Sequence, residues 1–472
     1  MLLMSTAAVL VHGYHPAVED GELYLPGVKK LLDRQLYPRN AQFFASHAGR
    51  SFFPNLIAAS VRLAHIPLNH ALLLWHLLTI FLLLSACWRI GYLCFGDELA
   101  AWGGASLVAA LLTLPVAGTA LYIMDQYLCT RSISTFSILF ALIGAIDRKY
   151  SRAAVWLLLT ALIHPLMVVF GAGYILLMLA VRNSRLSRAT LALAFAPFAW
   201  LPPVSTSYMQ SLDLHPYFFL NRWAWFAVLG AIAPLGIFWC YRIIARRFDL
   251  PRLALLSSTA IAFGTSSLLV AMLITVPARF AGLTLLQPMR ALHLIYILMF
   301  VFGGCLLAQH IFKRHIWRWI LLFVPLCGGM FFAQRSLFPA TPHIEWPGVT
   351  PNNNWMHAFA WIRDNTPKDA FFALDPQYMT MKDLDEHGFR ANADRSRMAD
   401  IWDSGSVTMF PAIAEEWKRQ VSALEHWPDF HPEDFQRLHA EWGVDWVLLA
   451  ISQAEGLNCP YTNTTLAVCR LD

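Results

Sequence analysis

Long apolar segments separated by short polar connections fill the first 338 residues, and the chain then becomes polar. A helix needs roughly 20 apolar residues to cross about 30 Å of hydrocarbon, and several of these segments approach or exceed that length. The predicted crossings are residues 68–95, 99–120, 132–146, 153–181, 190–204, 223–241, 253–276, 291–312 and 316–334. With the short apolar segment 1–10, read as a truncated first helix, the pattern predicts about ten membrane segments.

One of these segments, residues 153–181, is interrupted at His164-Pro165. Basic clusters lie at both of its ends, and cytoplasmic loops are enriched in Lys and Arg. We therefore expect two short helices that turn at His164 and return to the same side. The other basic loops alternate in the same way, which predicts that the first loop and the C-terminal part both lie outside the cytoplasm.

The first loop, residues 15–54, is the largest polar segment within the membrane part. Val28, Leu31, Leu32 and Leu36 fall on one helical face, which favours a helix lying in the membrane interface over an ordinary solvated loop helix. A second interfacial helix is predicted over residues 54–65, since Pro67 closes it.

Residues 339–472 predict a separate soluble α/β domain, so the chain divides into a membrane domain, 1–338, and this C-terminal domain. Its predicted helices are 355–362, 409–424 and 433–442, and its predicted strands are 370–374 and 444–449. Cys459 and Cys469 are compatible with a disulfide in an oxidising compartment or with two free buried thiols.

Composition agrees with this layout. Apolar residues make up 57% of the chain and charged residues only 14%, about half the charged share of a soluble domain. The net charge of +5 is spread in short clusters along the chain. Such clusters orient membrane helices, and they argue against a nucleic-acid surface.

The acidic pair Glu19-Asp20 is the main candidate for chemistry, because carboxylates near a membrane segment need a partner when they are desolvated. The alternative is that Glu19, Asp20 and Glu22 form a solvated acidic start to a helix. The chain has no P-loop, G-x-S-x-G or H-E-x-x-H motif, and its first loop has no D-x-D. The pair is therefore compatible with binding a divalent cation such as Mg²⁺ or Mn²⁺, or with working without a metal.

The layout resembles the GT-C superfamily of integral-membrane glycosyltransferases, in particular its uncharacterised bacterial GT-C-like branch. The resemblance is carried by the overall order of segments and by four short stretches: VEDGELYLPGVKKLLD in the first loop, TALIHPLMVVFGAGYIL, LQPMRALHLIYIL and WIRDNTPKDAFFAL. It implies a bacterial inner-membrane enzyme that moves a sugar from a polyprenyl-phosphate carrier to an unknown extracytoplasmic acceptor, whether glycan, lipid or protein.

The resemblance also implies roles for particular residues. An acidic residue of the first loop would act as the catalytic base, which matches Asp20 best and Glu19 second. The donor phosphate would need cations on the same side, and the candidates are Arg290, Arg279, Arg131 and Arg50. Each of these four is equally compatible with anchoring a helix end in the headgroup region. Gln287 and His164 are further polar candidates, although His164 is also compatible with satisfying backbone groups freed by Pro165.

Two other interpretations remain open. One is a membrane protein without catalysis, either a transporter of a polar or lipid-linked substrate or an assembly factor. The other is a relative that keeps the fold and has lost activity. A transporter would carry ionisable residues inside several spans. Here the span centres are apolar apart from His76, His164 and His293, which favours chemistry at one membrane face.

Overall fold

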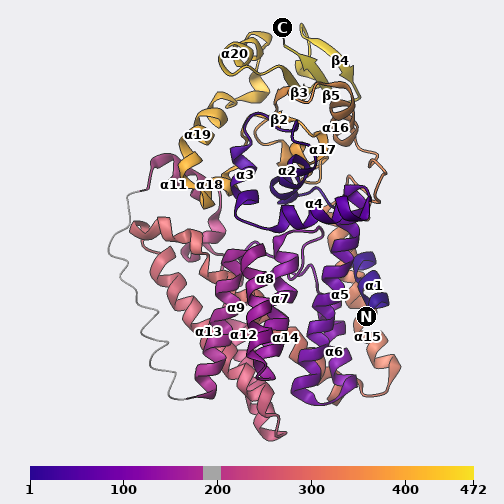
Figure 1. Cartoon of the computed structure of the whole chain (residues 1–472), viewed down its shortest axis with the longest axis vertical. Coiled ribbons are helices and arrows are strands. Elements are labelled where there is room, and N and C mark those ends of the chain that lie inside the picture. The colour runs from indigo at the N-terminus through magenta and orange to yellow at the C-terminus, as the bar shows by residue number, and fades with distance from the viewer. Residues whose placement is uncertain (184–203, 472) are drawn as a thin grey trace.

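A bundle of apolar helices carries a smaller sheet-containing domain, and the helices of the first loop lie between the two (Figure 1). This computed structural model describes residues 1–183 and 204–471. The predicted class, a polytopic helical membrane protein with a small C-terminal α/β domain, is confirmed. Within the described residues, six helical segments are long and apolar enough to cross a membrane: Leu68–Phe95, Pro165–Arg182, Trp225–Arg247, Pro251–Thr275, Phe280–Phe312 and Ile316–Leu337. The predicted crossing 190–204 lies outside the described residues except for its last one.

The helices of the bundle are α1 (Leu2–His12), α5 (Leu68–Phe95), α6 (Glu98–Ala110), α7 (Thr130–Ile146), α8 (Tyr150–Ile163), α9 (Pro165–Arg182), α12 (Trp225–Arg247), α13 (Pro251–Thr275), α14 (Ala291–Leu306) and α15 (Ile316–Leu337). A π-helical turn, η5 (Leu307–Phe312), continues α14. Shorter elements at the domain side are α11 (Thr206–Asp213), η1 (Pro216–Phe218), η2 (Leu220–Arg222), η3 (Ala278–Leu286) and η4 (Pro288–Arg290).

The chain breaks at His164, where α8 ends and α9 begins, as the His-Pro step predicts. Pro165 takes the first position of α9, which needs no backbone donor. The carbonyls left open at the end of α8 accept hydrogen bonds from the first loop: the Ser51 hydroxyl donates to Ile163 at 2.6 Å, and the Phe52 N–H to Leu162 at 2.8 Å. The first loop is therefore fixed to the break in the membrane helix.

The predicted crossing 99–120 is wrong in its second half. The helix α6 ends at Ala110, and residues 111–129 form turns with an isolated bridge between Pro115 and Tyr122. Pro115 lacks a backbone N–H and disfavours helical backbone in the residue before it, which disfavours a helix through this position. The irregular segment leads directly into α7.

The first loop forms α2 (Gly21–Leu32), α3 (Gln42–Gly49) and α4 (Phe53–Ala64). The prediction that the Val28 helix lies in the membrane interface is wrong. Residues 21–28 of α2 are all buried, and Lys29 donates at 2.7 Å to the carbonyl of Ala391 in the C-terminal domain. Leu36 lies beyond the end of the helix. The protein therefore covers residues 21–28 of α2, whereas Leu31 is exposed.

The C-terminal domain contains a five-stranded mixed sheet of order β2-β1-β3-β5-β4, in which β2, β1 and β3 are parallel and β5 is antiparallel to both its neighbours. The strands are β1 (Phe371–Ala373), β2 (Ser396–Arg397), β3 (Trp446–Ala450), β4 (Asn458–Thr462) and β5 (Leu466–Arg470). The helices are α16 (Asn354–Asn365), α17 (Phe389–Ala393), α18 (Ser404–Met409), α19 (Ala414–Ala423) and α20 (Pro432–Trp442).

Alternate side chains of the central strands enter two separate cores, as the period of a strand requires. Phe372 and Leu448 pack in one core with α16, and Val447 and Leu449 pack in the other with α20. The predicted helix 409–424 begins later than expected, at Ala414, because Pro411 interrupts the chain after α18. The terminal β4–β5 pair was not predicted. It contains the Cys459–Cys469 disulfide, so the two cysteines are paired rather than free thiols.

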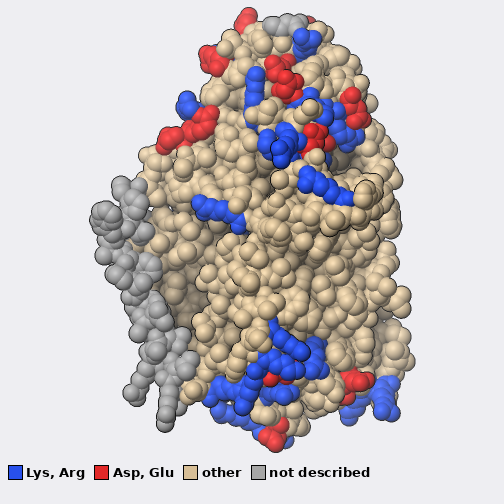
Figure 2. All heavy atoms as spheres, in the orientation of Figure 1, with Lys and Arg blue, Asp and Glu red and all other residues tan. Residues whose placement is uncertain are grey.

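Charged side chains are distributed unevenly over the surface. In Figure 2, Lys and Arg gather at the end of the bundle remote from the sheet domain and over the domain itself, with a largely uncharged band between them. A surface that contacts the hydrocarbon of a bilayer has to be largely uncharged, as this band is. Together with the apolar helices, it indicates a multi-pass membrane protein.

Candidate functional site

Glu19 and Asp20 lie on a tight turn at the start of α2. Glu19 has a φ of 45°. This left-handed conformation is energetically unfavourable for a residue that has a Cβ. Its N–H donates to the carbonyl of Glu386 in the C-terminal domain at 3.1 Å, which holds the turn in place. Although Asp20 occupies the cap position of α2, its carboxylate does not cap the helix. It points instead to the membrane bundle.

Arg131, in the first turn of α7, joins two carboxylates. Its Nη1 donates to Asp20 Oδ2 at 2.7 Å, while its Nε and Nη2 donate to the two oxygens of Asp125 at 3.2 and 3.0 Å. The side chains of Arg131 and Asp125 are buried, whereas that of Asp20 is 32% exposed. The positive end of the α7 dipole also favours carboxylates at this position. Asp20 is therefore held in one orientation with part of its carboxylate open.

Asp20 is ionised at neutral pH. Burial opposes its ionisation, but the charge and hydrogen bond of Arg131, together with Arg290 and His47, hold the pKa of Asp20 below its usual range. His47, on α3, is neutral, because burial and the nearby Arg290 and Arg50 lower its pKa to about 4. The first loop thus supplies one anionic and one neutral polar group beside two cations.

Arg290, at the end of η4, is the cation of this group with unused hydrogen-bonding capacity. Its Nε is buried and has no hydrogen-bond partner in the part of the chain that the structure describes. The side chain lines two narrow cavities, one beside Thr119 and Tyr217 and the other beside His293 and Gly171. An unpaired buried guanidinium nitrogen is costly, and an anionic ligand would remove that cost.

The remaining predicted residues lie around this centre. Arg50 stacks on the ring of Phe410, 4.5 Å from its centroid. Gln287 directs its amide toward the sulfur of Met409, 3.6 Å away. His164 lies near Arg131, Arg290 and His47. The structure therefore gathers Asp20, Glu19, Arg131, Arg290, Arg50, Gln287 and His164 where the first loop meets the helix bundle and α18. The side chain of Arg279 lies outside the described residues.

Glu19 differs from Asp20 in its charge state. Its carboxyl accepts a hydrogen bond from the Tyr127 hydroxyl at 3.1 Å and is hydrogen-bonded to the carboxyl of Glu386. Burial, followed by the nearby carboxylates of Glu386, Asp125 and Asp20, raises the pKa of Glu19 to about 8. Burial and Asp385 raise that of Glu386 as well. This pair therefore keeps at least one proton at neutral pH, and Glu19 is poorly suited to accept another.

The Glu19–Glu386 pair makes stability fall as pH rises. The unfolded chain releases these protons near the ordinary glutamate pKa of 4.5, whereas the folded chain keeps one until about pH 8. The stabilisation is complete below pH 4.5 and decreases up to pH 8. In Glu386→Gln, the loss of folding free energy over this pH range should be smaller by about 1 kcal/mol. The measurement is the apparent melting temperature from pH 5 to 8. Glu433→Gln, on the exposed start of α20, is the matched control, and a slope unchanged by Glu386→Gln would contradict the assignment.

The sequence analysis did not identify two residues of this centre, Asp125 and His47. Asp125 lies in residues 111–129, part of which was assigned to a helix, and His47 lies in a short helix that was not predicted. A signal for Asp125 was present, since it is an acidic residue between apolar segments and six positions before Arg131. The ion pair between Asp125 and Arg131 forms only because the irregular segment brings the two side chains together.

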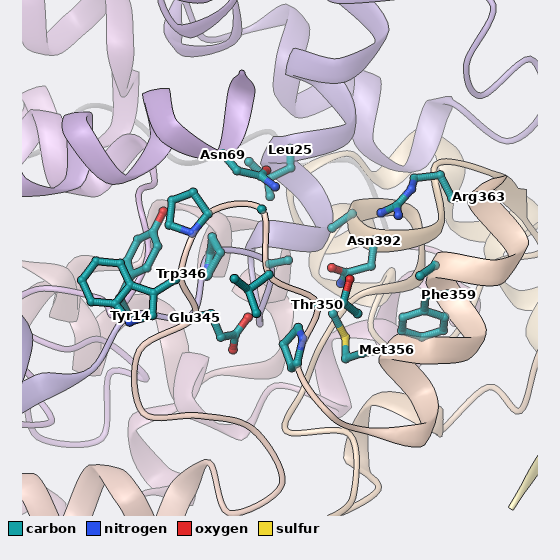
Figure 3. Close-up of a pocket in the computed structure, with 18 of the residues that line it drawn as sticks. Tyr14, Leu25, Asn69, Glu345, Trp346, Thr350, Met356, Phe359, Arg363 and Asn392 are labelled. Carbon is teal, nitrogen blue, oxygen red and sulfur yellow. The ribbon is translucent and has the colours of Figure 1, made fainter. Parts of the chain in front are cut away.

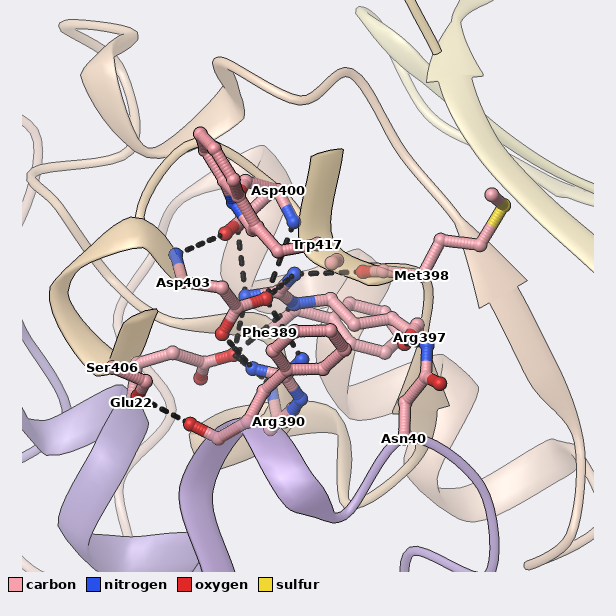
Figure 4. A network of polar contacts seen from close by, with 12 residues as sticks. Glu22, Asn40, Phe389, Arg390, Arg397, Met398, Asp400, Asp403, Ser406 and Trp417 are labelled. Carbon is pink, nitrogen blue, oxygen red and sulfur yellow. Dashed lines mark hydrogen bonds and ion pairs between the residues drawn. The ribbon is translucent and has the colours of Figure 1, made fainter. Parts of the chain in front are cut away.

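Glu22, which the alternative interpretation assigned to a solvated acidic helix start, is buried in an ionic network with the C-terminal domain (Figure 4). It accepts hydrogen bonds from Arg397 Nε and Nη2 at 3.2 and 3.1 Å, and from the backbone N–H groups of Arg390 and Ala391 at 3.1 and 2.9 Å. Arg390 also forms a bidentate pair with Asp403, at 2.8 and 3.0 Å. The network fixes α2, and with it Asp20, to the C-terminal domain.

A separate cavity of about 330 Å³ opens between the first loop, residues 345–351 and α16 (Figure 3). Trp346, Asn69, Asn392 and Arg363 are among the residues that line it. None of the predicted site residues lines this cavity.

Comparison with known proteins supports the fold. No protein-family model matches the chain, and a search of curated proteins finds no significant relative. Among solved structures, the chain is similar to the archaeal oligosaccharyltransferase AglB from Archaeoglobus fulgidus, in complex with an inhibitory peptide and a dolichol-phosphate. The TM-score is 0.50 and the identity 12%, over 95% of this chain and 69% of that one. An Archaeoglobus fulgidus oligosaccharyltransferase in complex with Zn and sulfate matches with a TM-score of 0.42 and 15% identity, over 95% and 67%. The first match shows that the chain has a GT-C-like fold.

Proposed function

We propose that this chain, with its GT-C-like fold, is a glycosyltransferase that moves a sugar from a polyprenyl-phosphate carrier to an acceptor outside the cytoplasm. The observation that carries the proposal is the group formed by Asp20, Arg131 and Arg290 at one end of the membrane bundle. It combines an ionised, oriented carboxylate with a cation that has an unpaired nitrogen. The similarity to AglB, whose structure contains a dolichol-phosphate, supports a lipid-phosphate donor.

In this proposal Asp20 is the base. As the acceptor hydroxyl attacks the anomeric carbon, its proton passes to the open oxygen of Asp20, and the bond between the sugar and the phosphate oxygen breaks. Arg131 holds the carboxylate in position. Arg290 binds the phosphate and stabilises the negative charge that develops on it as it leaves. Arg50, at the rim, is a second phosphate contact, and Gln287 and His164 are polar groups around the donor.

The residues of this centre do not fit a divalent cation. The two carboxylates that face each other, Asp20 and Asp125, are joined by the guanidinium of Arg131, and Glu19 is engaged with Tyr127 and Glu386. In the described part of the chain, no group of three or more His, Cys, Asp or Glu side chains is placed to hold a metal ion. The positive charge between the carboxylates is supplied by Arg131.

The proposal also gives the protein an orientation. In this proposal Asp20 and the C-terminal domain lie on the extracytoplasmic side of a bacterial inner membrane. The positive-inside rule, applied to the basic end of the bundle, supports this orientation. There the cell envelope supplies glycans, lipids and proteins as acceptors.

Arg290→Ala is expected to weaken binding of undecaprenyl phosphate by about tenfold or more. The reason is that a buried charge-assisted hydrogen bond contributes about 1.5–3 kcal/mol. The measurement is binding of the lipid to the purified protein in a neutral detergent. Arg222→Ala removes the same charge from the exposed η2, where Arg222 is paired with Asp213, and serves as the control.

Two results would count against the proposed function. One is that the wild-type protein does not bind the lipid phosphate, which would leave only the fold in common with glycosyltransferases. The other is that Arg222→Ala weakens binding as much as Arg290→Ala, which would mean that general surface charge, rather than this centre, attracts the lipid.

A further inference from the structure

The end of the bundle opposite Asp20 carries a hollow that the proposed reaction does not use. It has a volume of about 650 Å³ and lies among the ends of α5, α7 and α9 and the start of α13. Arg131 is the second residue of α7, and Arg148 follows the other end of that helix. A helix of this length, 17 residues, separates the two by about 25 Å. The hollow is therefore near the opposite membrane surface.

Five cationic side chains and one carboxylate line this hollow, a net charge of about +4. The cations are Arg89, Arg148, Lys149, Arg182 and Arg252. They come from four separate places in the chain, so the cluster is produced by the fold and not by one basic stretch. In Figure 2, Lys and Arg gather at the lower end of the bundle.

The carboxylate does not neutralise the cluster. Asp147 is 3.9 Å from the guanidinium of Arg89, at the outer limit of an ion pair. Arg252 donates to the carbonyl of Leu93 at 3.0 Å and so is held beside the hollow. The side chains of Arg148 and Lys149 are exposed and form no hydrogen bond or ion pair with a described residue. Several N–H donors therefore face the hollow without an acceptor among the described residues.

Apolar side chains complete the wall. Ile146 and Leu256 are buried, and Leu255 is partly exposed beside them. A concave site with cations at the membrane surface and apolar walls toward the bilayer matches a lipid whose headgroup is anionic and whose chains remain in the membrane. The positive-inside rule explains basic residues at this end, but it does not require them to converge on one hollow.

We propose that this hollow is a binding site for the phosphate headgroup of an anionic membrane lipid. Arg148, Lys149 and Arg182 bind the phosphate oxygens, Arg89 and Arg252 form the sides, and Leu255 contacts the start of an acyl chain. The site is distinct from the Asp20 centre, at the other end of the same helices. The proposal does not depend on the proposed glycosyl transfer.

Native mass spectrometry of the purified full-length protein in an uncharged detergent tests the site. Phosphatidylglycerol and cardiolipin should remain bound to the wild type, and phosphatidylcholine should not. The double variant Arg148→Ala/Lys149→Ala should weaken binding about thirtyfold, because each basic side chain near an anionic lipid contributes about 1 kcal/mol. The control is Arg246→Ala/Arg247→Ala, which removes equal charge at the end of α12, outside the hollow.

Inorganic phosphate, added as a competitor, separates the two sources of the ligand. Failure of 10 mM phosphate to displace the lipid supports a lipid site, and full displacement would show instead a site for free phosphate. Equal losses in the two double variants, or equal retention of phosphatidylcholine, would overturn the proposal. Melting temperatures without added lipid show that both variants are folded, and only the wild type and the control should be stabilised by phosphatidylglycerol.

Discussion

Asp20→Asn is expected to lower the rate of sugar transfer from a polyprenyl-phosphate donor by a factor of about 10² to 10⁴, the range that a general base contributes. The asparagine oxygen still accepts the hydrogen bond that Arg131 now donates to Asp20 at 2.7 Å, so the site should keep its shape. What is lost is the ability to take up a proton. The measurement is turnover of the donor by the purified protein, with donor binding as a second readout that should change little.

Glu19→Gln is the comparison that makes this result specific. Because the pKa of Glu19 is raised to about 8, its carboxyl is protonated at neutral pH, and an amide reproduces its shape and charge. We expect a loss in turnover of less than about tenfold. If Glu19→Gln were the inactive variant and Asp20→Asn the active one, the base would be Glu19 and the assignment of roles would be reversed.

Glu22→Ala is expected to lower the free energy of unfolding by about 3–5 kcal/mol, the cost of breaking a buried ion pair by removing one partner. The two backbone N–H groups of Arg390 and Ala391 would lose their acceptor, and Arg397 would lose one of its carboxylates. The remaining carboxylates compensate in part: Asp403 contacts both arginines, and Asp400 is 2.8 Å from Arg397. The measurement is thermal or denaturant unfolding of the purified protein.

Glu425→Gln removes a charge from an exposed position of the same domain and should stay within about 0.5 kcal/mol of the wild type. A second readout is limited proteolysis, which should cut the first loop faster in Glu22→Ala than in the control because α2 is released from the domain. A Glu22→Ala protein as stable as the control would show that the network contributes no net stability.

The membrane helices were predictable because the bilayer imposes a length and a composition on each of them. The His164-Pro165 break, the acidic pair and the strands β1 and β3 of the C-terminal domain follow equally from local signals. The burial of Glu22 does not. Its partners are 368 to 375 residues away in the sequence, and a carboxylate with no nearby cation is expected to remain in water.

Contacts that depend on the tertiary fold also explain the errors at α2 and at Asp125. The apolar face of α2 indicates that something covers it, but a single sequence does not distinguish lipid from a later domain. The contact between Asp125 and Arg131 depends on the turns of residues 111–129, which follow the end of α6 at Ala110 inside an apolar run. Periodicity describes regular elements, and the centre of this site is built from the irregular segments between them.

The distance in sequence between Glu22 and its partners also sets an order of events during synthesis. At about 5 to 20 residues per second, the 368 residues between Glu22 and Arg390 take about 20 to 70 s to be made, far longer than a helix needs to form. During this time the Glu22 carboxylate has no counter-ion and must stay hydrated, so α2 cannot yet occupy its buried position. The membrane helices are therefore inserted around an unfinished first loop. Only a chain whose C-terminal domain has emerged and folded can close it, so a ribosome that stops early releases a protein whose Asp20 is not fixed in place.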